Sequence, residues 1–410
     1  MEKIVSVVGL FSMVGFAWLL SSHRSKIPWR IVGGGLFLQF ALALLVLKTT
    51  PGQMLFDQMG KVFNSLLDCV DVGSQQVFGA TYTDHFVAFK VLPTIIFFSS
   101  LLSMLYYLGV IQMIVQAAAW LMQKTLKTSG AESLSAAANI FVGQTEAPLI
   151  VKPYIESMTQ SELMSVMVGG FATIAGGVFA AYIGMGIDAS HLMTASVISA
   201  PAALLIAKVM QPEVEEPKTL GTVRVEFEQT ATNLIEAAGN GAIEGLRLCL
   251  NVGAMLLTFI ALVTVINVFV GWLGGICGFG DEWTLQRMLG LVFFPFAWLM
   301  GIPAGECWLA GELLGTKMVL NELLAYQELG EIIKADAEAE GAARLSPRSV
   351  TILTYALCGF ANFSSIGIQL GGIGGMAPSR QSDLARLAFR AMLGGTLAAF
   401  MTACIAGILL

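Results

Sequence analysis

The feature that most constrains this chain is a series of long apolar runs, free or almost free of charged residues, repeated from one end to the other. A helix that crosses a bilayer needs roughly 17 to 25 such residues. The runs that meet this length are Ile4 to Leu20, Ile31 to Leu47, Val91 to Gln123, Leu163 to Ile187, Ala189 to Ala207, Cys249 to Gly280, Ser349 to Ser379 and Ala391 to Leu410. The chain is 56% hydrophobic and 12% charged, whereas a soluble domain is about 25% charged. The sequence therefore predicts an all-α polytopic membrane protein with eight transmembrane helices.

Basic residues in the connections indicate the orientation of these helices. The segments 21–30 and 379–390 both carry several Arg or Lys residues. By the positive-inside rule both lie in the cytoplasm, so that both termini face outward. Two polar stretches remain. The stretch from Lys208 to Arg247 is predicted to be a cytoplasmic connection that ends in a surface helix, and the acidic stretch from Gln327 to Ser349 a solvated outer loop.

Two further apolar segments, Ser133 to Val151 and Met288 to Gly311, are interrupted by Gly, Pro and a carboxylate in the motifs GQTEAP and GIPAGE. Irregular backbone and charge are tolerated at membrane depth only where they face a cavity, a partner or a ligand. Each segment is followed by a Gly-rich run with a polar centre, GGFATIAGGV or CGFANFSSIG. Paired interruptions of this kind point to the substrate site of a secondary transporter. The sequence predicts two re-entrant helical hairpins in an inverted repeat.

The polar groups of these segments indicate the kind of ligand. Glu146 and Glu306 supply carboxylates, and Asn362, Ser364 and Ser365 supply an amide and hydroxyls, without a Lys or Arg near the membrane centre. This set suits a neutral, hydroxyl-rich solute, because a carboxylate can accept both hydrogens of a diol. Phe360 beside them offers an apolar face to a ring.

Structural roles remain open for the same residues. A buried carboxyl can bond to a neighbouring helix, as Glu146 or Glu306 would. Asn362 and Ser365 can bond across membrane helices, and the Thr173 hydroxyl can bond back to its own helix.

Five motifs, AANIFVGQTEAPL, IAGGV, GIPAGE, NELLAY and CGFANFSSIGIQLGG, together resemble the concentrative nucleoside transporter family. The resemblance covers essentially the whole chain. It implies a homotrimer of protomers with eight membrane helices, two re-entrant hairpins and an interfacial helix, in which an elevator-type transport domain moves on a trimeric scaffold. It divides the chain into 1–110 (scaffold helices), 111–210 (first half of the transport domain), 211–282 (cytoplasmic connection and a scaffold span) and 283–410 (second half of the transport domain).

The resemblance also implies roles for individual residues, by position in the motifs. The expected nucleobase contacts are Gln144, Thr145, Glu146 and Val178. The expected ribose contacts are Glu306, Asn362 and Ser365, with Phe360 as a packing surface. The expected sodium ligands, largely backbone carbonyls, are Asn139, Val142, Thr173 and Ile174. Thr173 stands where relatives carry Ser, and Gly305 where they carry Asn or Ser.

The function that follows from the resemblance is import of nucleosides such as uridine across a bacterial inner membrane by symport with sodium. It involves no chemical step and no cofactor besides the coupling ion. Three alternatives remain. They are a proton-coupled nucleoside symporter, a passive facilitator or channel for small polar solutes, and an intramembrane enzyme that uses Glu146 and Glu306 as an acid and base pair.

Overall fold

The computed structural model describes residues 1–219, 231–276, 283–338 and 343–410, and within these ranges the chain forms helices and no strand. The helices before the central connection are α1 (Glu2–Leu19), α2 (Trp29–Lys48), α3 (Thr50–Phe78), α4 (Leu92–Tyr107), α5 (Val110–Leu126), α6 (Gly130–Ala138), α7 (Glu146–Ile150), α8 (Lys152–Ile155), α9 (Gln160–Ala172), α10 (Gly176–Gly184) and α11 (Ala189–Met210). Those after it are α12 (Leu234–Ile276), α13 (Leu285–Leu299), α14 (Cys307–Val319), α15 (Glu322–Glu338), α16 (Pro347–Leu357), α17 (Phe363–Met376) and α18 (Gln381–Leu409). Short turns η1 (Tyr82–His85), η2 (Val87–Val91) and η3 (Pro378–Arg380) connect some of them.

The prediction of a multi-pass helical membrane protein is confirmed. Among the described residues, seven helical segments are long and apolar enough to cross a bilayer. The predicted run Ser349 to Ser379 is not continuous, because α16 ends at Leu357 and α17 begins at Phe363. The run Val91 to Gln123 is divided at Gly109, whose φ of +79° separates α4 from α5. The predicted end of the run Cys249 to Gly280 lies partly outside the described residues.

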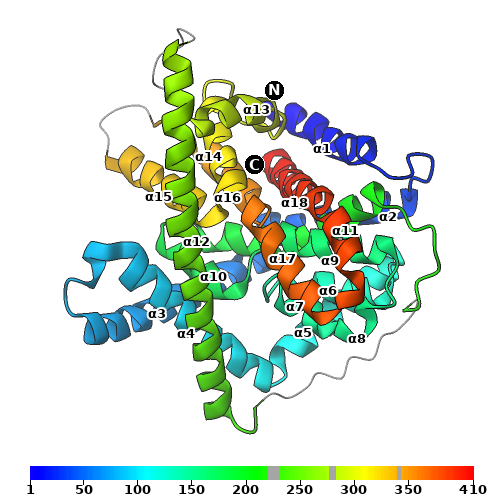
Figure 1. Ribbon diagram of the computed structural model, residues 1–410, viewed down its shortest axis with the longest axis horizontal. Coiled ribbons are helices and arrows are strands. Elements are labelled where there is room, and N and C mark those ends of the chain that lie inside the picture. The colour runs from blue at the N-terminus through cyan, green and yellow to red at the C-terminus, as the bar shows by residue number, and fades with distance from the viewer. Residues whose placement is uncertain (220–230, 277–282, 339–342) are drawn as a thin grey trace.

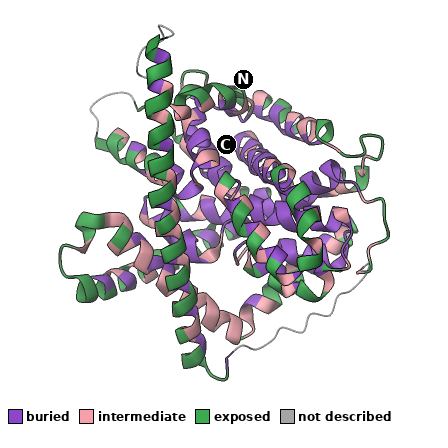
Figure 2. Cartoon of the chain, viewed as in Figure 1, coloured by how far each residue is buried: buried purple, intermediate pink, exposed green. Residues whose placement is uncertain are grey.

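The interior is built from α9, α11 and α18, while the long α12 is largely exposed along its length (Figures 1 and 2). In the apolar 18-residue stretch of each helix, 94% of the residues are buried in α11 but only 11% in α12. The buried helices are rich in Ala, Ser and Gly, which let helix backbones approach closely. The 43-residue α12 packs mainly along α4 and presents apolar side chains outward.

Two predictions about the polar stretches need correction. The residues predicted as a surface helix after Lys208 are the beginning of α12, which starts at Leu234. Before it, the chain from Gln211 to Thr219 lies against the starts of α6 and α9, where Gly130 N donates to Thr219 O at 2.8 Å. Residues 220–230 of this stretch lie outside the described residues.

The outer loop predicted from Gln327 to Ser349 is largely helix, because α15 continues to Glu338. Leu323, Tyr326 and Leu329 recur at helical spacing and are all buried, so the acidic composition of the other face concealed an amphipathic helix. Residues 339–342 of the predicted loop lie outside the described residues.

Candidate functional site

Two broken helices meet at their breaks in the middle of the fold. α9 ends at Ala172 before α10, and α16 ends at Leu357 before α17. Phe360 N donates to Thr173 O at 3.2 Å, which joins one break directly to the other. Gly359 has a φ of +134°, and a Cβ there would lie 2.8 Å from Phe171 O, so only glycine permits this approach. Helix ends leave unpaired backbone groups with partial charges, so four such ends gather around one point.

The turn after α6 brings the predicted nucleobase residues to this crossing. Gln144 Nε2 donates to Ser365 Oγ at 3.2 Å, and Gln369 Nε2 donates to Gln144 Oε1 at 3.2 Å. Thr145 packs on α17, where a Cβ on Gly372 would lie 2.8 Å from its methyl group. The structure therefore brings Gln144 and Thr145 together with Ser365, although they come from opposite halves of the sequence. Val178, another residue of this group, is buried in α10.

The carboxylate that joins this cluster is Glu322, at the start of α15. Asn362 Nδ2 donates to Glu322 Oε2 at 3.1 Å, and the Tyr182 hydroxyl donates to Glu322 Oε1 at 2.9 Å. Asn362 also begins α17, since its Oδ1 accepts from Ser365 N at 2.9 Å. Glu322 is 5% exposed, so these hydrogen bonds hold a buried acid.

The predicted pairing of Glu306 with Asn362 and Ser365 is contradicted. Glu306 precedes α14, and its Oε2 accepts from Ser346 N at 2.9 Å and from Ser346 Oγ at 3.0 Å. The 13 residues of α14 separate Glu306 from the turn at Leu320 by roughly 20 Å at 1.5 Å per residue. Within the described ranges, no hydrogen bond joins Glu306 to Asn362 or Ser365.

The physical reason is the position of the turn. We expected the hairpin to turn at Pro303 and Gly305, but these residues lie in the connection between α13 and α14. The hairpin instead turns at Leu320 and Asn321, without Gly or Pro, between two packed helices. The sequence signal was the motif NELLAY, which places a carboxylate directly after the turn. Tyr182 and Gln369 were missed as well, since each lies within an apolar run.

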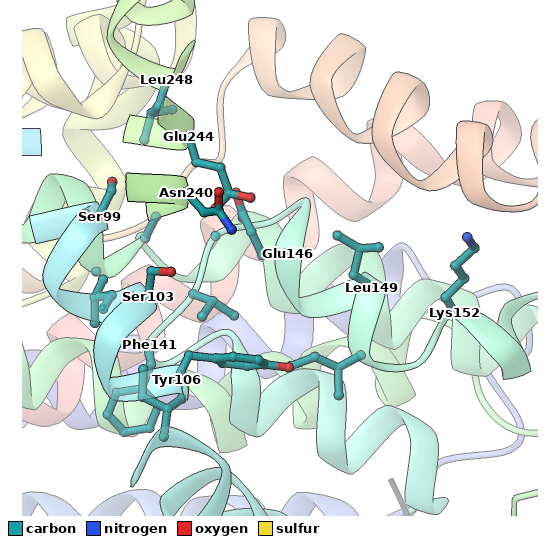
Figure 3. A pocket seen from close by; sticks show the side chains of 18 of the residues that line it. Ser99, Ser103, Tyr106, Phe141, Glu146, Leu149, Lys152, Asn240, Glu244 and Leu248 are labelled. Atoms are coloured by element: carbon teal, nitrogen blue, oxygen red, sulfur yellow. The ribbon is translucent and has the colours of Figure 1, made fainter. Parts of the chain in front are cut away.

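Glu146 faces an open cavity rather than the buried cluster. The cavity has a volume of about 700 Å³ and lies between the first hairpin, α4 and α12. Asn240 and Glu244 of α12 and Ser103 of α4 line it together with Glu146 (Figure 3). This volume is within the range of small-molecule sites, about 300 to 1,000 Å³. Glu146 is therefore accessible to a solute, unlike Glu322.

The predicted sodium ligands lie at the end of α6 and at the break after α9. Asn139 is fully buried, and its Nδ2 donates to Ser135 O at 3.0 Å. Its Oδ1 has no hydrogen-bond donor among the described residues. The Thr173 hydroxyl donates to Gly169 O at 2.9 Å, as its structural alternative predicted. A buried oxygen without a donor fits a small cation, and Val142 and Ile174 belong to the irregular backbone beside it.

One buried cation lies close to the second broken helix and was not considered in the sequence analysis. Lys317 lies in the last turn of α14 and is 2% exposed. Its Nζ donates to Ala356 O, in the last turn of α16, at 2.9 Å. The second broken helix therefore ends against an ammonium group.

The chain has apolar helices long enough to span a membrane, and two hairpin turns that lie beside two broken helices. Polar groups from both halves meet where the broken helices cross. This arrangement defines a secondary transporter of the membrane. Comparison with known families gives the same result. Residues 8–81 match the N-terminal and residues 191–407 the C-terminal domain described as Na+ dependent nucleoside transporter, and residues 88–189 match a domain described as nucleoside recognition. The chain belongs to the family of sodium-dependent, concentrative nucleoside transporters, which are transporters and not enzymes.

Individual relatives cover the chain from end to end. Solute carrier family 28 member 3 of Mus musculus is 45% identical over 100% of this chain, which spans 59% of that longer protein. An uncharacterized transporter of Haemophilus influenzae is 45% identical over 100% of this chain and 98% of its own length. The solved structure of CNTnw in an inward-facing substrate-bound state has a TM-score of 0.90 and 42% identity, covering 100% of this chain and 98% of that one.

Proposed function

We propose that this protein imports nucleosides across a bacterial inner membrane by symport with sodium. The family provides the substrate class and the ion. The observation that carries the proposal is the convergence of Gln144, Ser365, Asn362 and Glu322 at the crossing of the two broken helices. Amide, hydroxyl and carboxylate groups from both halves give a site that can bind both parts of a nucleoside at once.

Glu322, rather than Glu306, is the proposed ribose carboxylate. A carboxylate accepts charge-assisted hydrogen bonds from two neighbouring hydroxyls, which are about twice as strong as neutral ones. Asn362 and Tyr182 hold both oxygens of Glu322 at fixed positions through bonds of 3.1 and 2.9 Å. Ser365 completes the sugar side, and Phe360, half-buried at the break, provides an apolar surface.

The nucleobase would contact Gln144, Thr145, Glu146 and Val178. Gln144 and Thr145 already lie against α17, on the sugar side of the site. Glu146 lines the 700 Å³ cavity, through which a solute would reach the site. A base hydrogen-bonded by Gln144 and Glu146 would span the space between the buried cluster and this cavity.

Asn139, Val142, Thr173 and Ile174 would hold the sodium ion, whose gradient supplies the driving force for uptake. Asn139 Oδ1, which accepts no hydrogen bond from the residues that the structure describes, supports this assignment. The ion would lie beside the Thr173 carbonyl, which also accepts from Phe360 N. Binding of the ion would therefore affect the position of both broken helices.

We further propose a homotrimer in which a transport domain with two re-entrant hairpins moves against a scaffold. The long α12 packs mainly on α4 and leaves a broad apolar face for copies of the chain or lipid. Of the proposed scaffold region 1–110, α1 and α2 pack on α18 and α11, and α3 and α4 pack on α11 and α10. These contacts would form the surface along which the transport domain, residues 111–210 and 283–410, moves on a scaffold that also contains α12.

Uptake of radiolabelled uridine into proteoliposomes tests the proposal, with an inward sodium gradient, an inward proton gradient or neither. Accumulation only with sodium is the expected result. Accumulation only with protons would keep the substrate and overturn the ion, whereas equilibration under every condition would indicate a facilitator. Absence of uridine and adenosine uptake under all conditions would contradict the proposed function.

A further inference from the structure

Both halves contain the same series of elements around the crossing. In the first half, α6 leads into the hairpin turn and packs on α9, which breaks before α10. In the second half, α14 leads into its turn and packs on α16, which breaks before α17. The ends of α6 and α14 therefore hold equivalent places, each beside the C-terminal end of a broken helix.

The two places differ in charge. Asn139 lies one residue after the end of α6, and its Oδ1 is a buried acceptor without a donor among the described residues. Lys317 lies two residues before the end of α14. Relative to their helix ends the two positions are three residues apart, about one helical turn, and so on a similar face. One half offers an acceptor for a cation, and the other half carries a cation of its own.

The Lys317 ammonium meets groups that attract a cation. Its Nζ lies 2.9 Å from Ala356 O, one of the last carbonyls of α16. The final carbonyls of a helix lack partners within the helix and carry partial negative charge. Glu322 lies five residues further along the chain, past the turn at Leu320 and Asn321. A buried charge is retained only where such partners compensate for the lost water.

Lys317 and the ligand-cluster residue Glu322 lie on either side of the second hairpin turn. Glu322 accepts from Asn362, which begins α17 on the other side of the break. Lys317 therefore binds the end of α16 directly, and Glu322, just past the turn, binds Asn362 on the other side of the break.

Building on the proposed function, we infer that the Lys317 ammonium is the covalently attached counterpart of the coupling sodium ion. It holds the second broken helix and Glu322 in the geometry that binds a nucleoside, as a bound ion would in the first half. Only the first half then depends on a cation from solution. Lys317 is a positioning residue, because it acts on the substrate through Glu322.

Lys317→Gln removes the charge and keeps a polar side chain that is one bond shorter. Uridine binding to the purified full chain is measured by calorimetry in saturating sodium, with the unfolding temperature recorded in parallel. We expect the Kd for uridine to rise at least about tenfold, the scale of one hydrogen bond to a charged group. Lys317→Arg, which keeps the charge, should retain most of the affinity. Parent-like affinity in Lys317→Gln would overturn the inference.

Lys317→Ala permits rescue with propylammonium, which has the atoms that this substitution removes. The amine should lower the Kd for uridine toward the parent value in a saturable manner. Lys208→Ala is the matched control, since Lys208 is also 2% exposed but is paired with Glu132 at 2.7 Å away from the crossing. It should lose thermal stability, keep its uridine affinity and show no response to the amine.

Two outcomes separate this inference from the proposed function. If the parent chain binds uridine and Lys317→Ala loses binding without rescue, as a purely structural lysine would, the inference fails alone. If the parent binds neither uridine nor adenosine, the proposed function fails and the inference fails with it.

Discussion

The hairpin turns of the two halves differ in how they treat their polar groups. The first turn, between α6 and α7, is irregular and leaves Glu146 in an open cavity and Asn139 Oδ1 without a donor in the described part of the chain. The second turn, at Leu320 and Asn321, is short, and its Glu322 is buried between Asn362 and Tyr182. One turn is left open for solute and ion, while the other is completed by side chains of the chain itself. Two halves with the same series of helices can therefore serve different functions at their turns.

The largest effect expected from this comparison is that of Glu322→Gln. We expect a loss of uridine affinity of roughly 100-fold, because hydrogen bonds to a charged group contribute about 1.5 to 3 kcal/mol each and about 1.4 kcal/mol corresponds to tenfold. Equilibrium binding of uridine and of a nucleoside without the 2′ and 3′ hydroxyls measures it. The affinities of the parent and the variant should differ far less for the analogue than for uridine. Equal losses for both ligands would place Glu322 away from the sugar.

A smaller and different effect is expected in the first half from Asn139→Ala. The sodium concentration for half-maximal uridine uptake should rise about tenfold, because the change removes a buried oxygen that fits the ion. Thermal stability without sodium should change little, since Oδ1 bonds no described protein group and only the bond to Ser135 O is lost. Sodium titrations of uptake and of the unfolding temperature measure both. An unchanged sodium requirement would remove Asn139 from the ion site.

Gln144→Ala tests the contact between the halves. The change removes the bonds to Ser365 and Gln369, and we expect about a tenfold rise in the Kd for uridine, in line with about 1 kcal/mol for a neutral hydrogen bond and the loss of one base contact. Competition between nucleosides with different bases should also change in order. Gln144→Glu, similar in shape, controls for volume. A uniform loss for all bases would indicate that Gln144 only positions Ser365.

The smallest effect on binding is expected from Glu306→Gln. Its carboxylate contacts Ser346 beside the start of α14, which is the end away from the turn at Leu320. Uridine affinity should therefore remain within about twofold of the parent. The unfolding temperature should fall by a few degrees, because the bonds to the start of α16 weaken by about 1 kcal/mol. Binding and thermal unfolding of the same sample provide the comparison with Glu322→Gln. A loss of affinity as large as that of Glu322→Gln would reverse the assignment of the two glutamates.

The sequence predicted the polar residues of the first half better than those of the second. Gly143 lies in a true irregularity, whereas Pro148 lies within α7, and Gln144 and Thr145 lie at the crossing as expected. In the second half the same signal, Pro303 and Gly305, marks only a connection between helices. Glycine and proline indicate where a helix can stop, but the packing of α14 on α15 and α16 decides where the hairpin turns.

The sequence alone determined that the chain crosses a membrane and that two halves contribute polar groups to one site, because apolar run length and the cost of buried charge are local properties. Only the tertiary structure decided which glutamate reaches that site. It also decided that Lys317 lies within the protein, and that the run from Ser349 to Ser379 is broken. These outcomes depend on contacts between residues far apart in the chain, whose energies do not appear in the pattern of any single segment.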